Sequence, residues 1–404
     1  MQHLKKNFTT LRRKTISVVI IWIYKVIFLF LQLFPKKNNH IIFESFLGKQ
    51  YSDSPRAIYE YMVNKYSGYE MYWAANRSAI PQFKNRGIKY VRRLSFKWLI
   101  LMARSKYWVT NSRLPLWLPK SKDTLYIQTW HGTPLKRLAA DMHEVHMPGT
   151  NSKTYKDNFL KEASKWDYLV SPNEYSTEIF RRAFDFQKEV IESGYPRNDY
   201  ILNYNNEKYI KDLKTKYGLP TDKKVILYAP TWRDNQYHEI GKYRFNLEMD
   251  IDKLYNALGD DYIVLLRLHY LVAENIDLQG YDNFVKDFST HEDIRDLYLI
   301  SDILITDYSS VFFDYANLRR PMIFFVYDIE EYRDTLRGFY FDLEKKAPGP
   351  LVKTTDELIT EIKNLEINDF NTSDRIEQFY KKFCYLEDGN ASERVVKAVF
   401  KIND

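Results

Sequence analysis

Short apolar runs alternate with amphipathic stretches along most of the chain. Short apolar runs that end at a polar residue are typical of buried strands, and apolar positions spaced by three and four indicate helices. Strands that alternate with helices predict a mostly parallel sheet covered by helices on both faces. The first series of predicted strands comprises His40–Phe43, Tyr69–Ala75, Ile88–Val91, Tyr107–Thr110, Leu125–Thr129, Tyr168–Val170 and Val190–Glu192.

A polar stretch at Asn203–Lys216 separates this series from a second one. We therefore expect two Rossmann-like α/β domains, residues 38–215 and 216–404, with Ser373–Phe383 as a candidate helix that crosses back onto the first domain. The second series of strands comprises Lys224–Tyr228, Tyr262–Leu268, Asn283–Val285, Ile303–Thr306 and Met322–Val326, and its predicted helices are Ile251–Leu258, Asp293–Ile300, Val311–Leu318 and Thr355–Leu365.

The stretch Ile16–Phe34 is apolar except for a few positions, among them Lys25 and Gln32. As a helix it would be about 28 Å long, close to the hydrocarbon thickness of a bilayer. Lys25 near its middle disfavours a lone spanning helix, whereas Trp22, Tyr24 and the flanking basic residues favour a helix that lies on an anionic membrane surface. A spanning helix and a helix buried in the protein stay open as alternatives. A signal peptide is disfavoured because no small-residue cleavage site follows.

Positive charge is concentrated at the start of a chain whose net charge is +7. Residues 1–37 hold eight lysines and arginines and no acidic residue, so this segment is predicted to associate with a membrane. The rest of the chain is nearly neutral, which argues against nucleic-acid binding. The single cysteine, Cys384, excludes an intramolecular disulfide framework and a multi-cysteine metal site. Dinucleotide-binding, Walker and nucleophile-elbow motifs are absent from the sequence.

Ligands bind at the carboxyl ends of the strands in parallel α/β sheets, so the polar residues there are candidate site residues. His131 follows the strand Leu125–Thr129, with Gly132 in a turn and a helix expected to begin at Thr133-Pro134. An unperturbed imidazole pKa of ~6.5 suits a general base near neutral pH. The alternative is a histidine that only hydrogen-bonds the turn.

Two further strand ends carry groups that could bind an anion. Arg267 and His269 end the run that begins at Tyr262, and strand alternation points both side chains to one side. Arg233 follows the strand Lys224–Tyr228, where it could pair with phosphate oxygens. A surface pair in the first case and a solvated loop arginine in the second are the alternatives.

Ser309 and Ser310 lie between the strand Ile303–Thr306 and the next predicted helix. Two hydroxyls beside free N–H groups at the start of a helix can hold a phosphate. Simple N-capping by serine is the alternative. Thr306 and Asp307 at the strand end favour a ligand-binding role.

These motifs, in their order along the chain, resemble the CDP-glycerol glycerophosphotransferases of Gram-positive teichoic acid synthesis. The resemblance spans roughly residues 40 to 345, in register throughout. Its motifs are FESFLGKQYSDSPRAIYEYM at 43–62, TWHGTPLK at 129–136, APTWRD at 229–234, RLH at 267–269, HEDIRDLYLISDILITDYSSVFFDYA at 291–316 and PMIFFVYDIEEYRDTLRGFYFD at 321–342.

The resemblance implies an α/β fold of two Rossmann-like domains that face a central cleft, the GT-B type. It implies an enzyme at the cytoplasmic face of the membrane. Such an enzyme transfers glycerol phosphate from CDP-glycerol, or ribitol phosphate from CDP-ribitol, to a hydroxyl of a polyprenyl-linked saccharide acceptor and releases CMP. Neither a metal nor another cofactor is implied in the chemistry. The short chain is more similar in length to primases and short-chain transferases than to the longer polymerases.

The resemblance also implies roles for the matching residues. His131 would remove the proton of the acceptor hydroxyl, and the other groups would hold the donor. Asp293 and Asp296, three residues apart on one helix face, match positions that the family associates with donor binding; a solvated helix face is the alternative. The candidate substrate-binding residues are Arg233, His269, Asp293, Asp296, Thr306, Asp307, Ser309 and Ser310.

Two other classes of function stay open from the sequence. A nucleotide-sugar glycosyltransferase of the same fold would release a nucleoside diphosphate instead of CMP. A membrane-associated scaffold would keep the fold without catalysis, although His131, His269 and the serine pair argue against this. The oligomeric state is also open, and a homo-oligomer is compatible with the sequence.

Overall fold

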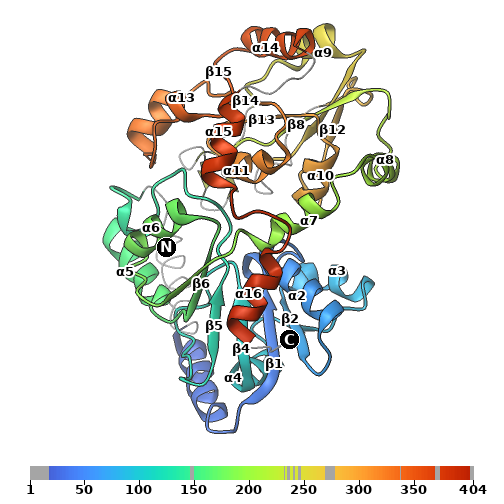
Figure 1. Cartoon of the computed structure of the whole chain (residues 1–404). Coiled ribbons are helices and arrows are strands. Elements are labelled where there is room, and N and C mark those ends of the chain that lie inside the picture. The colour runs from blue at the N-terminus through green and yellow to red at the C-terminus, as the bar shows by residue number, and fades with distance from the viewer. Residues whose placement is uncertain are drawn as a thin grey trace, which may run out of the picture.

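The computed structural model of the protein describes residues 18–145, 150–231, 233, 237–239, 242–243, 247–268, 278–336, 338–368 and 374–400. Two parallel sheets lie one above the other, each with helices around it (Figure 1). A short antiparallel ribbon of β9 (Tyr237–Glu239) and β10 (Lys242–Tyr243) is separate from both sheets. The predicted α/β class with parallel sheets is confirmed.

The first sheet has seven strands, and all of their pairings are parallel. The buried parts of these strands coincide with apolar runs of the sequence, as expected for strands that helices cover on both faces. In spatial order the strands are β3 (Tyr90–Arg92), β2 (Glu70–Ala75), β1 (Lys37–Glu44), β4 (Ser105–Thr110), β5 (Leu125–Gln128), β6 (Tyr168–Ser171) and β7 (Glu189–Glu192).

The second sheet has six strands, again with parallel pairings throughout. Its central strands are buried along most of their length. In spatial order the strands are β12 (Val285–Asp287), β11 (Tyr262–Leu266), β8 (Lys224–Tyr228), β13 (Ile303–Thr306), β14 (Met322–Phe325) and β15 (Leu351–Val352).

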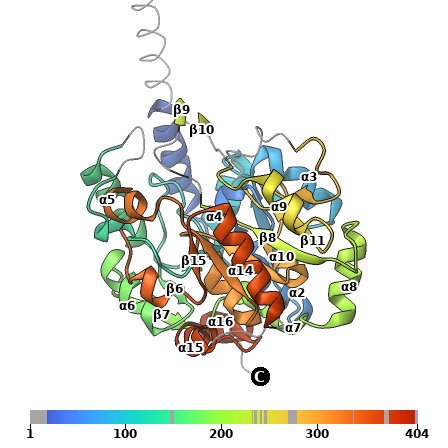
Figure 2. The same ribbon diagram turned by 90° about the horizontal axis from the view of Figure 1, so that it is seen from above.

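Helices flank the strands on both sides when the molecule is viewed from above (Figure 2). Those of the first half are α2 (Asp53–Lys65), α3 (Ile80–Asn85), α4 (Phe96–Arg104), α5 (Ser152–Ala163), α6 (Glu174–Ala183), α7 (Asp199–Asn203) and α8 (Glu207–Lys216). Those of the second half are α9 (Ile251–Leu258), α10 (Ile294–Ile300), α11 (Val311–Tyr315), α12 (Ile329–Glu331), α13 (Leu343–Lys346), α14 (Thr355–Ile367), α15 (Asp374–Phe383) and α16 (Ala391–Phe400).

Each sheet has a hydrophobic cluster on both of its faces, because alternate residues of a strand point to opposite sides. In β1, Ile42 joins the cluster that contains Trp108, whereas Ile41 and Phe43 join the cluster on the other face. The second sheet is divided in the same way into two clusters. Polar residues at the strand ends are therefore held by rigid, buried strands.

Residues 18–31 form a helix that lies against the first sheet with one face only. Tyr24, Ile27, Phe28 and Leu31 pack on the cluster of Trp108, with the i, i+3, i+4, i+7 spacing of an amphipathic helix. Phe28 is fully buried, and the hydroxyl of Tyr24 donates a hydrogen bond to the carbonyl of Leu94. Among the described residues, no helix is long and apolar enough to cross a membrane.

The chain crosses back onto the first sheet, but not with the segment that the sequence suggested. Ser373–Phe383 was the expected crossing segment, and its described part, α15, packs through Phe379 and Phe383 on the cluster of the second sheet. Its end also contacts the first half, where the side chain of Asn173 donates to the carbonyl of Phe383. The crossing is made by α16, whose Val395 and Phe400 join the cluster of β1 and α2. α16 lies against the first sheet in Figure 1. The segment that returns to the first sheet is therefore α16, which follows α15 after a polar turn.

Candidate active site

The chain turns sharply after β5, and a buried indole anchors the turn. Trp130 has a left-handed φ of 53°, a conformation that is uncommon for a non-glycine residue and concentrated at functional sites. Its backbone N–H donates to Oε1 of Gln128, and its indole ring packs 4.7 Å, centre to centre, from the ring of Phe184. The turn is therefore rigid, and it places the next residue, His131, at the carboxyl edge of the first sheet.

The imidazole of His131 is held in one orientation. Its Nδ1 lies 2.7 Å from the carbonyl oxygen of Asn111, and the ring stacks 4.5 Å from that of Trp130. The ring of Phe46 meets it edge-on at 5.8 Å. A carbonyl only accepts hydrogen bonds, so Nδ1 carries the proton in the neutral ring and Nε2 keeps its lone pair. This is the tautomer that a general base needs.

The surroundings of His131 favour its neutral form. The residue is exposed at the sheet edge, yet protein packs densely around the ring, and this desolvation lowers its pKa from the usual value. The hydrogen bond to Asn111 and the charge of Asp53 act in the opposite direction, while Arg197 and Arg113 lower the pKa further. The imidazole is therefore an unprotonated acceptor at neutral pH.

The helix expected at Thr133-Pro134 does not form, and this prediction was wrong. The backbone of this segment pairs instead with residues 338–340 of the second half. Tyr340 N–H donates to the carbonyl of Leu135, and Arg137 N–H donates to that of Gly338. These long-range bonds satisfy backbone groups that an isolated helix would have bonded locally, so tertiary pairing overrides the local signal.

The His131 turn meets the Ser309-Ser310 turn of the second sheet. A Cβ atom added to Gly132 would lie only 2.6 Å from Oγ of Ser310, so no residue with a side chain fits there without movement. Glycine thus permits the close approach of two turns that lie far apart in the sequence. The structure brings His131 and Ser310 together at the junction of the two sheet edges.

Both serine hydroxyls at this junction lack hydrogen-bond partners among the described residues. Ser310 stands at the start of α11, but its side chain makes no capping hydrogen bond. Ser309 and Ser310 are partly exposed, and neither hydroxyl bonds to any residue that the structure describes. Serines at helix starts usually cap the helix. Two uncommitted hydroxyls are consequently available to a ligand.

Arg233, in contrast, is bound within the protein. Its guanidinium donates to Asp307 at 2.8 Å and to both carboxylate oxygens of Asp328, at 2.7 and 2.9 Å. The side chain is 3% exposed and lies over the rings of Tyr308 and Tyr332. Burial opposes its charge, but the two carboxylates outweigh burial and raise the pKa of Arg233.

Thr306 and Asp307 are also committed to the protein. Thr306 is fully buried, and its hydroxyl donates to the carbonyl of Ala229 at 2.7 Å. Asp307 accepts from the N–H of Thr231 at 2.8 Å as well as from Arg233. Together these bonds fasten the loop after β8 to the loop after β13. The two loops that carry Arg233 and the serine pair therefore form one rigid unit.

Asp293 and Asp296 point to different partners. Asp293 caps the start of α10 and binds Arg295 at 2.6 Å and Arg56 of the first half at 2.9 Å. Burial opposes the ionised form of Asp293, but the arginines lower its pKa. Asp296 faces away from this pair and accepts from the hydroxyls of Tyr200 and Tyr217. Asp293 thus links the two halves, whereas Asp296 anchors α10 to the segment around α8.

One predicted site residue, His269, lies outside the described residues. Its neighbour Arg267 is described, and its guanidinium donates to the carbonyls of Phe288 and Ser289, both at 2.7 Å. Burial lowers the pKa of Arg267. Arg267 is therefore used to hold the loop after β12.

The sequence reasoning missed a buried ionic cluster beneath the junction. Arg197, which is 5% exposed, binds both oxygens of Asp314 at 2.9 and 3.1 Å and lies 3.4 Å from Asp53. The side chain of Asn198 also donates to Asp314. Arg197 lies just after β7, so the rule that inspects strand ends could have found it. The cluster joins the first half to α11, which follows the serine pair.

A cavity of about 490 Å³ opens beside His131 on the side of the first sheet. Its wall includes Trp130, Phe159 and Arg113, whose guanidinium lies 4.5 Å from the ring centre of Phe159. At its base, buried Glu162 accepts from the hydroxyl of Tyr126 at 3.0 Å. The cavity combines aromatic surface with one cation, and the candidate base forms part of its wall.

Comparisons with known proteins agree with this arrangement. The model of the family described as CDP-Glycerol:Poly(glycerophosphate) glycerophosphotransferase matches residues 26–401. The chain is 60% identical over 396 residues to the teichoic acid poly(glycerol phosphate) polymerase of Bacillus subtilis (strain 168), covering 98% of this chain and 52% of that protein. It therefore spans about half the length of that relative.

A second relative is nearly coextensive with the chain. The teichoic acid poly(glycerol phosphate) polymerase of Bacillus spizizenii (strain ATCC 23059 / NRRL B-14472 / W23) is 56% identical over 382 residues, which cover 94% of this chain and 96% of that protein. Length therefore does not separate primases from polymerases, because a relative named as a polymerase is about as long as this chain.

The fold matches a solved structure over almost all of its length. A variant of the wall teichoic acid polymerase TagF, soaked with CDPG, superposes with a TM-score of 0.86 at 43% identity, covering 96% of this chain and 97% of that one. With the family model matched from residue 26 to residue 401, the chain belongs to the CDP-glycerol:poly(glycerophosphate) glycerophosphotransferase family.

Proposed function

We propose that the protein transfers glycerol phosphate from CDP-glycerol to a hydroxyl of a polyprenyl-linked teichoic acid acceptor and releases CMP. One observation carries the proposal: the turn that holds His131 closely approaches the turn that holds Ser310, through Gly132, at the junction of two sheet edges. A base for an alcohol and donors for a phosphate are the two elements that such a transfer requires. Family membership supports the same reaction.

In the proposed reaction, the acceptor oxygen attacks the phosphorus atom that carries glycerol. Its proton passes to Nε2 of His131 as the new P–O bond forms. The P–O bond to the cytidine phosphate then breaks, and CMP leaves with the electron pair. General-base assistance of this kind contributes about 10² to 10⁴ in rate. The hydroxyls of Ser309 and Ser310 donate to the phosphate oxygens on which negative charge grows.

Arg233, Asp307 and Thr306 act as positioning residues in this proposal. Their hydrogen bonds join the loop after β8 to the loop after β13, so they hold the serine pair in place. A guanidinium already bound by two carboxylates has little capacity left for a third anion. The contacts therefore favour this role over direct binding of the pyrophosphate.

Asp293 and Asp296 are proposed to shape the donor side of the site through their neighbours. Asp293 aligns Arg295 and Arg56, and Asp296 aligns Tyr200 and Tyr217. His269 retains its expected role as a donor to the pyrophosphate, since it comes three residues after the end of β11 in the sequence and ligands bind at the carboxyl ends of parallel strands.

We also propose a two-domain arrangement of the GT-B type, with residues 38–215 as the acceptor domain and residues 216–404 as the CDP-alditol domain. The two separate parallel sheets support this division. The return of α16 onto the first sheet ties the domains together. The cavity beside His131 supplies the acceptor side with aromatic surface and the positive charge of Arg113.

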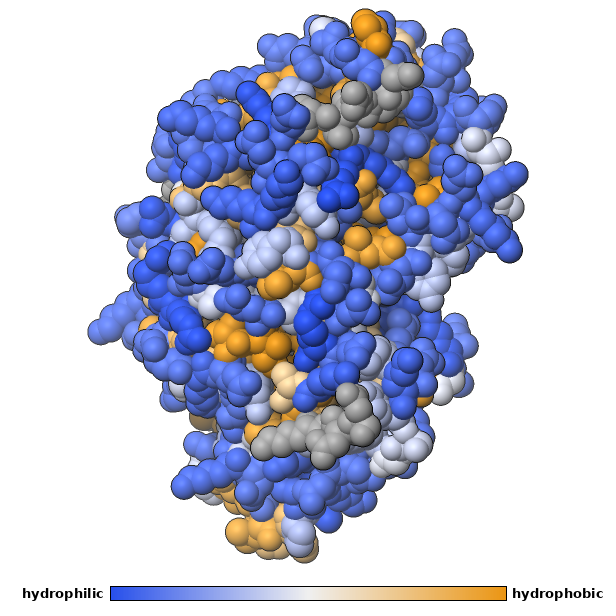
Figure 3. All heavy atoms as spheres, viewed as in Figure 1, coloured by the Kyte–Doolittle hydropathy of each residue, from blue (hydrophilic) through white to orange (hydrophobic). Residues whose placement is uncertain are grey.

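The membrane is the proposed source of the acceptor. Helix 18–31 exposes large apolar side chains on the face that does not pack on the protein, including Trp22 and Phe30 at 65% and 60% exposure. Figure 3 shows a hydrophobic patch at the lower tip of the molecule. Leu33 and Phe34, which follow this helix in the sequence, are exposed as well. We infer peripheral attachment to the cytoplasmic face of the membrane through residues 1–37.

Two variants test the proposed roles of His131 as the base and of the serine pair in donor binding. His131→Ala should reduce transfer by about 10² to 10⁴ while CDP-glycerol still binds, because the imidazole acts on the acceptor proton. The double variant Ser309→Ala/Ser310→Ala should weaken CDP-glycerol binding roughly tenfold, because hydrogen bonds to charged groups are lost. Calorimetric titration gives the donor affinity, and CMP release in the presence of a lipid-linked acceptor gives the rate. Retention of turnover by His131→Ala within threefold would contradict the assigned base.

The same assay separates the proposed reaction from its alternatives. Release of a nucleoside diphosphate from a sugar nucleotide would indicate a glycosyltransferase. Absence of turnover with every donor would indicate a scaffold. Parallel incubations with CDP-glycerol and CDP-ribitol, followed by mass measurement of the product, distinguish the two alditols. The 60% identical relative is named for glycerol phosphate, which favours CDP-glycerol.

A further inference from the structure

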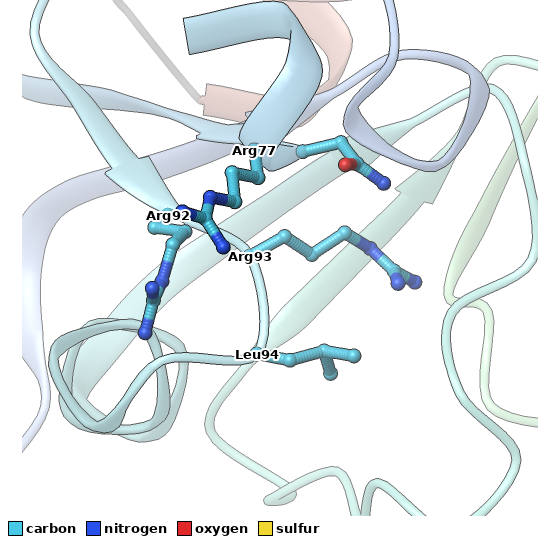
Figure 4. A pocket seen from close by; sticks show the side chains of 5 residues that line it. Arg77, Arg92, Arg93 and Leu94 are labelled. Carbon is cyan, nitrogen blue, oxygen red and sulfur yellow. The ribbon is translucent and has the colours of Figure 1, made fainter.

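A basic pocket at the carboxyl ends of β2 and β3 has no part in the reaction described above. Its volume is about 260 Å³, and Asn76, Arg77, Arg92, Arg93 and Leu94 form its lining. Figure 4 shows these side chains from close by, with Arg77 coming from the segment after β2 and Arg92 from the end of β3. Three arginines around one small pocket create a positive potential that attracts anions.

The pocket has one carboxylate for its three arginines. Glu44, at the end of β1, is 1% exposed and accepts from Nε of Arg93 at 3.0 Å. Arg77 and Arg92 are both exposed, and the side chain of neither makes an ion pair or a hydrogen bond with any residue in the described part of the chain. The lining therefore carries a surplus of two positive charges, which matches a phosphate or diphosphate group.

The three guanidinium groups are not equivalent. In Figure 4, Arg77 extends toward the start of the Arg92 side chain, while Arg93 and Leu94 extend to the opposite side. Glu44 explains the course of Arg93, since its buried carboxylate fixes the Nε of that side chain. Arg77 and Arg92 are thus the two arginines that an incoming anion can engage.

The backbone connects this pocket to the candidate base. Glu44 is followed by the turn that contains Phe46, whose ring lies 5.8 Å from that of His131. Gly48 of the same turn bonds to the N–H of Asn76 through its carbonyl at 2.7 Å. The same turn therefore contacts both the pocket, through Gly48, and the proposed reaction centre, through Phe46.

The pocket is also connected to the proposed membrane helix. The carbonyl of Leu94 accepts a hydrogen bond from Tyr24 of helix 18–31 at 3.1 Å. Leu94 has a left-handed φ of 60° and is 39% exposed, an uncommon combination for a leucine. An exposed apolar side chain beside two free arginines suits a ligand whose phosphate adjoins hydrocarbon.

We propose that this pocket is a binding subsite for a phosphate group of the lipid-linked acceptor, separate from the site of transfer. The proposal rests on the proposed function, because it places the acceptor between the membrane helix and His131. Arg77 and Arg92 donate to the phosphate oxygens, and Leu94 contacts the adjoining lipid chain. The subsite holds the acceptor by its charge while the terminal hydroxyl reaches the base.

The double variant Arg77→Gln/Arg92→Gln tests the subsite. Lys208→Gln/Lys211→Gln is the matched control, since it removes two exposed positive charges from α8. In the transfer assay, the arginine variant should raise the KM for the lipid-linked acceptor about tenfold, as hydrogen bonds to a charged group are lost. The KM for CDP-glycerol and kcat should stay within twofold of the unaltered protein, and the lysine control should match it throughout.

A titration with a soluble short-chain prenyl diphosphate tests the pocket without any turnover. The unaltered protein and the lysine control should bind this probe, and the arginine variant should bind it about tenfold more weakly. This arm still decides the proposal if the protein transfers nothing, so failure of the proposed function is recognised separately. The charge-retaining variant Arg77→Lys/Arg92→Lys should recover part of the affinity.

Two results would overturn the proposal. One is equal affinity of the arginine variant and the control for the prenyl diphosphate, with an unchanged acceptor KM. The other is reduced sedimentation with vesicles of anionic phospholipid while prenyl diphosphate affinity stays unchanged. The second result would identify the arginines as a contact with bilayer headgroups instead of an acceptor subsite.

Discussion

The two sheet edges that meet at His131 differ in how their polar groups are used. At the edge of the second sheet, Arg233 and Asp293 are bound within the protein by partners of opposite charge. At the edge of the first sheet, Arg77 and Arg92 make no ion pair in the described structure, and Nε2 of His131 is not engaged. Arg233 at the second edge is thus locked by ion pairs, although the serine pair beside it is uncommitted in the described structure. The first edge contains the ion pairs of Arg93 and Arg197, but it also presents two arginines that no described carboxylate binds.

This difference shows that an arginine at a strand end is not by itself an anion site. Arg233 follows β8 and Arg92 ends β3, and only Arg233 was expected from the sequence to bind a phosphate. The count of carboxylates within reach distinguishes them. Asp307 and Asp328 neutralise Arg233, while the only carboxylate of the basic pocket, Glu44, is bound by Arg93.

The largest effect that tests the comparison is expected at Arg233. Arg233→Ala leaves Asp307 and Asp328 buried without their cation, so the free energy of unfolding should fall by about 3–5 kcal/mol. Arg77→Ala removes an exposed side chain without an ion pair, so its effect should stay within about 0.5 kcal/mol. Urea denaturation measures both. Equal, small losses in the two variants would mean that the second edge is not locked.

The sequence predicted most of the fold because apolar runs and strand burial have the same physical cause. The runs at His40–Phe43 and Lys224–Tyr228 lie inside observed strands or coincide with them, and the helix Ile251–Leu258 has the predicted bounds. The predicted ends of the strands were less accurate than their centres, since the boundaries of a strand depend on pairing with its neighbours. β15 was not predicted, because a strand of two residues has no periodicity to detect.

The candidate site was predictable only as far as position along the chain determines it. The strand-end rule placed His131 and the serine pair correctly at sheet edges, and Gly132 allows them to meet. The partners of Arg233 could not be predicted, because Asp328 lies 95 residues away and the sequence does not reveal which carboxylate approaches. The failed helix at Thr133 has the same cause, namely pairing with a distant segment.

A smaller effect is expected for the apolar face of helix 18–31, which belongs to the open half of the molecule. Trp22→Ser/Phe30→Ser should reduce binding to phospholipid vesicles roughly tenfold or more, because buried apolar area drives interfacial binding. Ile367→Ser is a matched control, since Ile367 is an apolar residue of α14 that is 80% exposed. Vesicle sedimentation measures the difference. Loss of binding in the control as well would contradict a specific apolar face.

The smallest effect concerns the charges near His131 at the first sheet edge. It tests whether these charges set the pKa of the imidazole. The base works only when neutral, so kcat/KM should fall as the pH drops through the pKa of His131, which desolvation lowers below its usual value of ~6.5. Asp53 raises this pKa and Arg113 lowers it. Asp53→Asn should therefore move the acid limb to lower pH, and Arg113→Gln should move it to higher pH, each by about half a unit.

The two variants are expected to shift the acid limb in opposite directions. A general loss of structure would instead displace the acid limb of both variants in the same direction. Asparagine tolerates the left-handed backbone of Asp53, whose φ is 65°, so the substitution adds little strain. Lys208→Gln/Lys211→Gln should leave the limb in place. Shifts of equal sign in the two variants, or none, would show that another group sets the acid limb and that the imidazole of His131 is not the base.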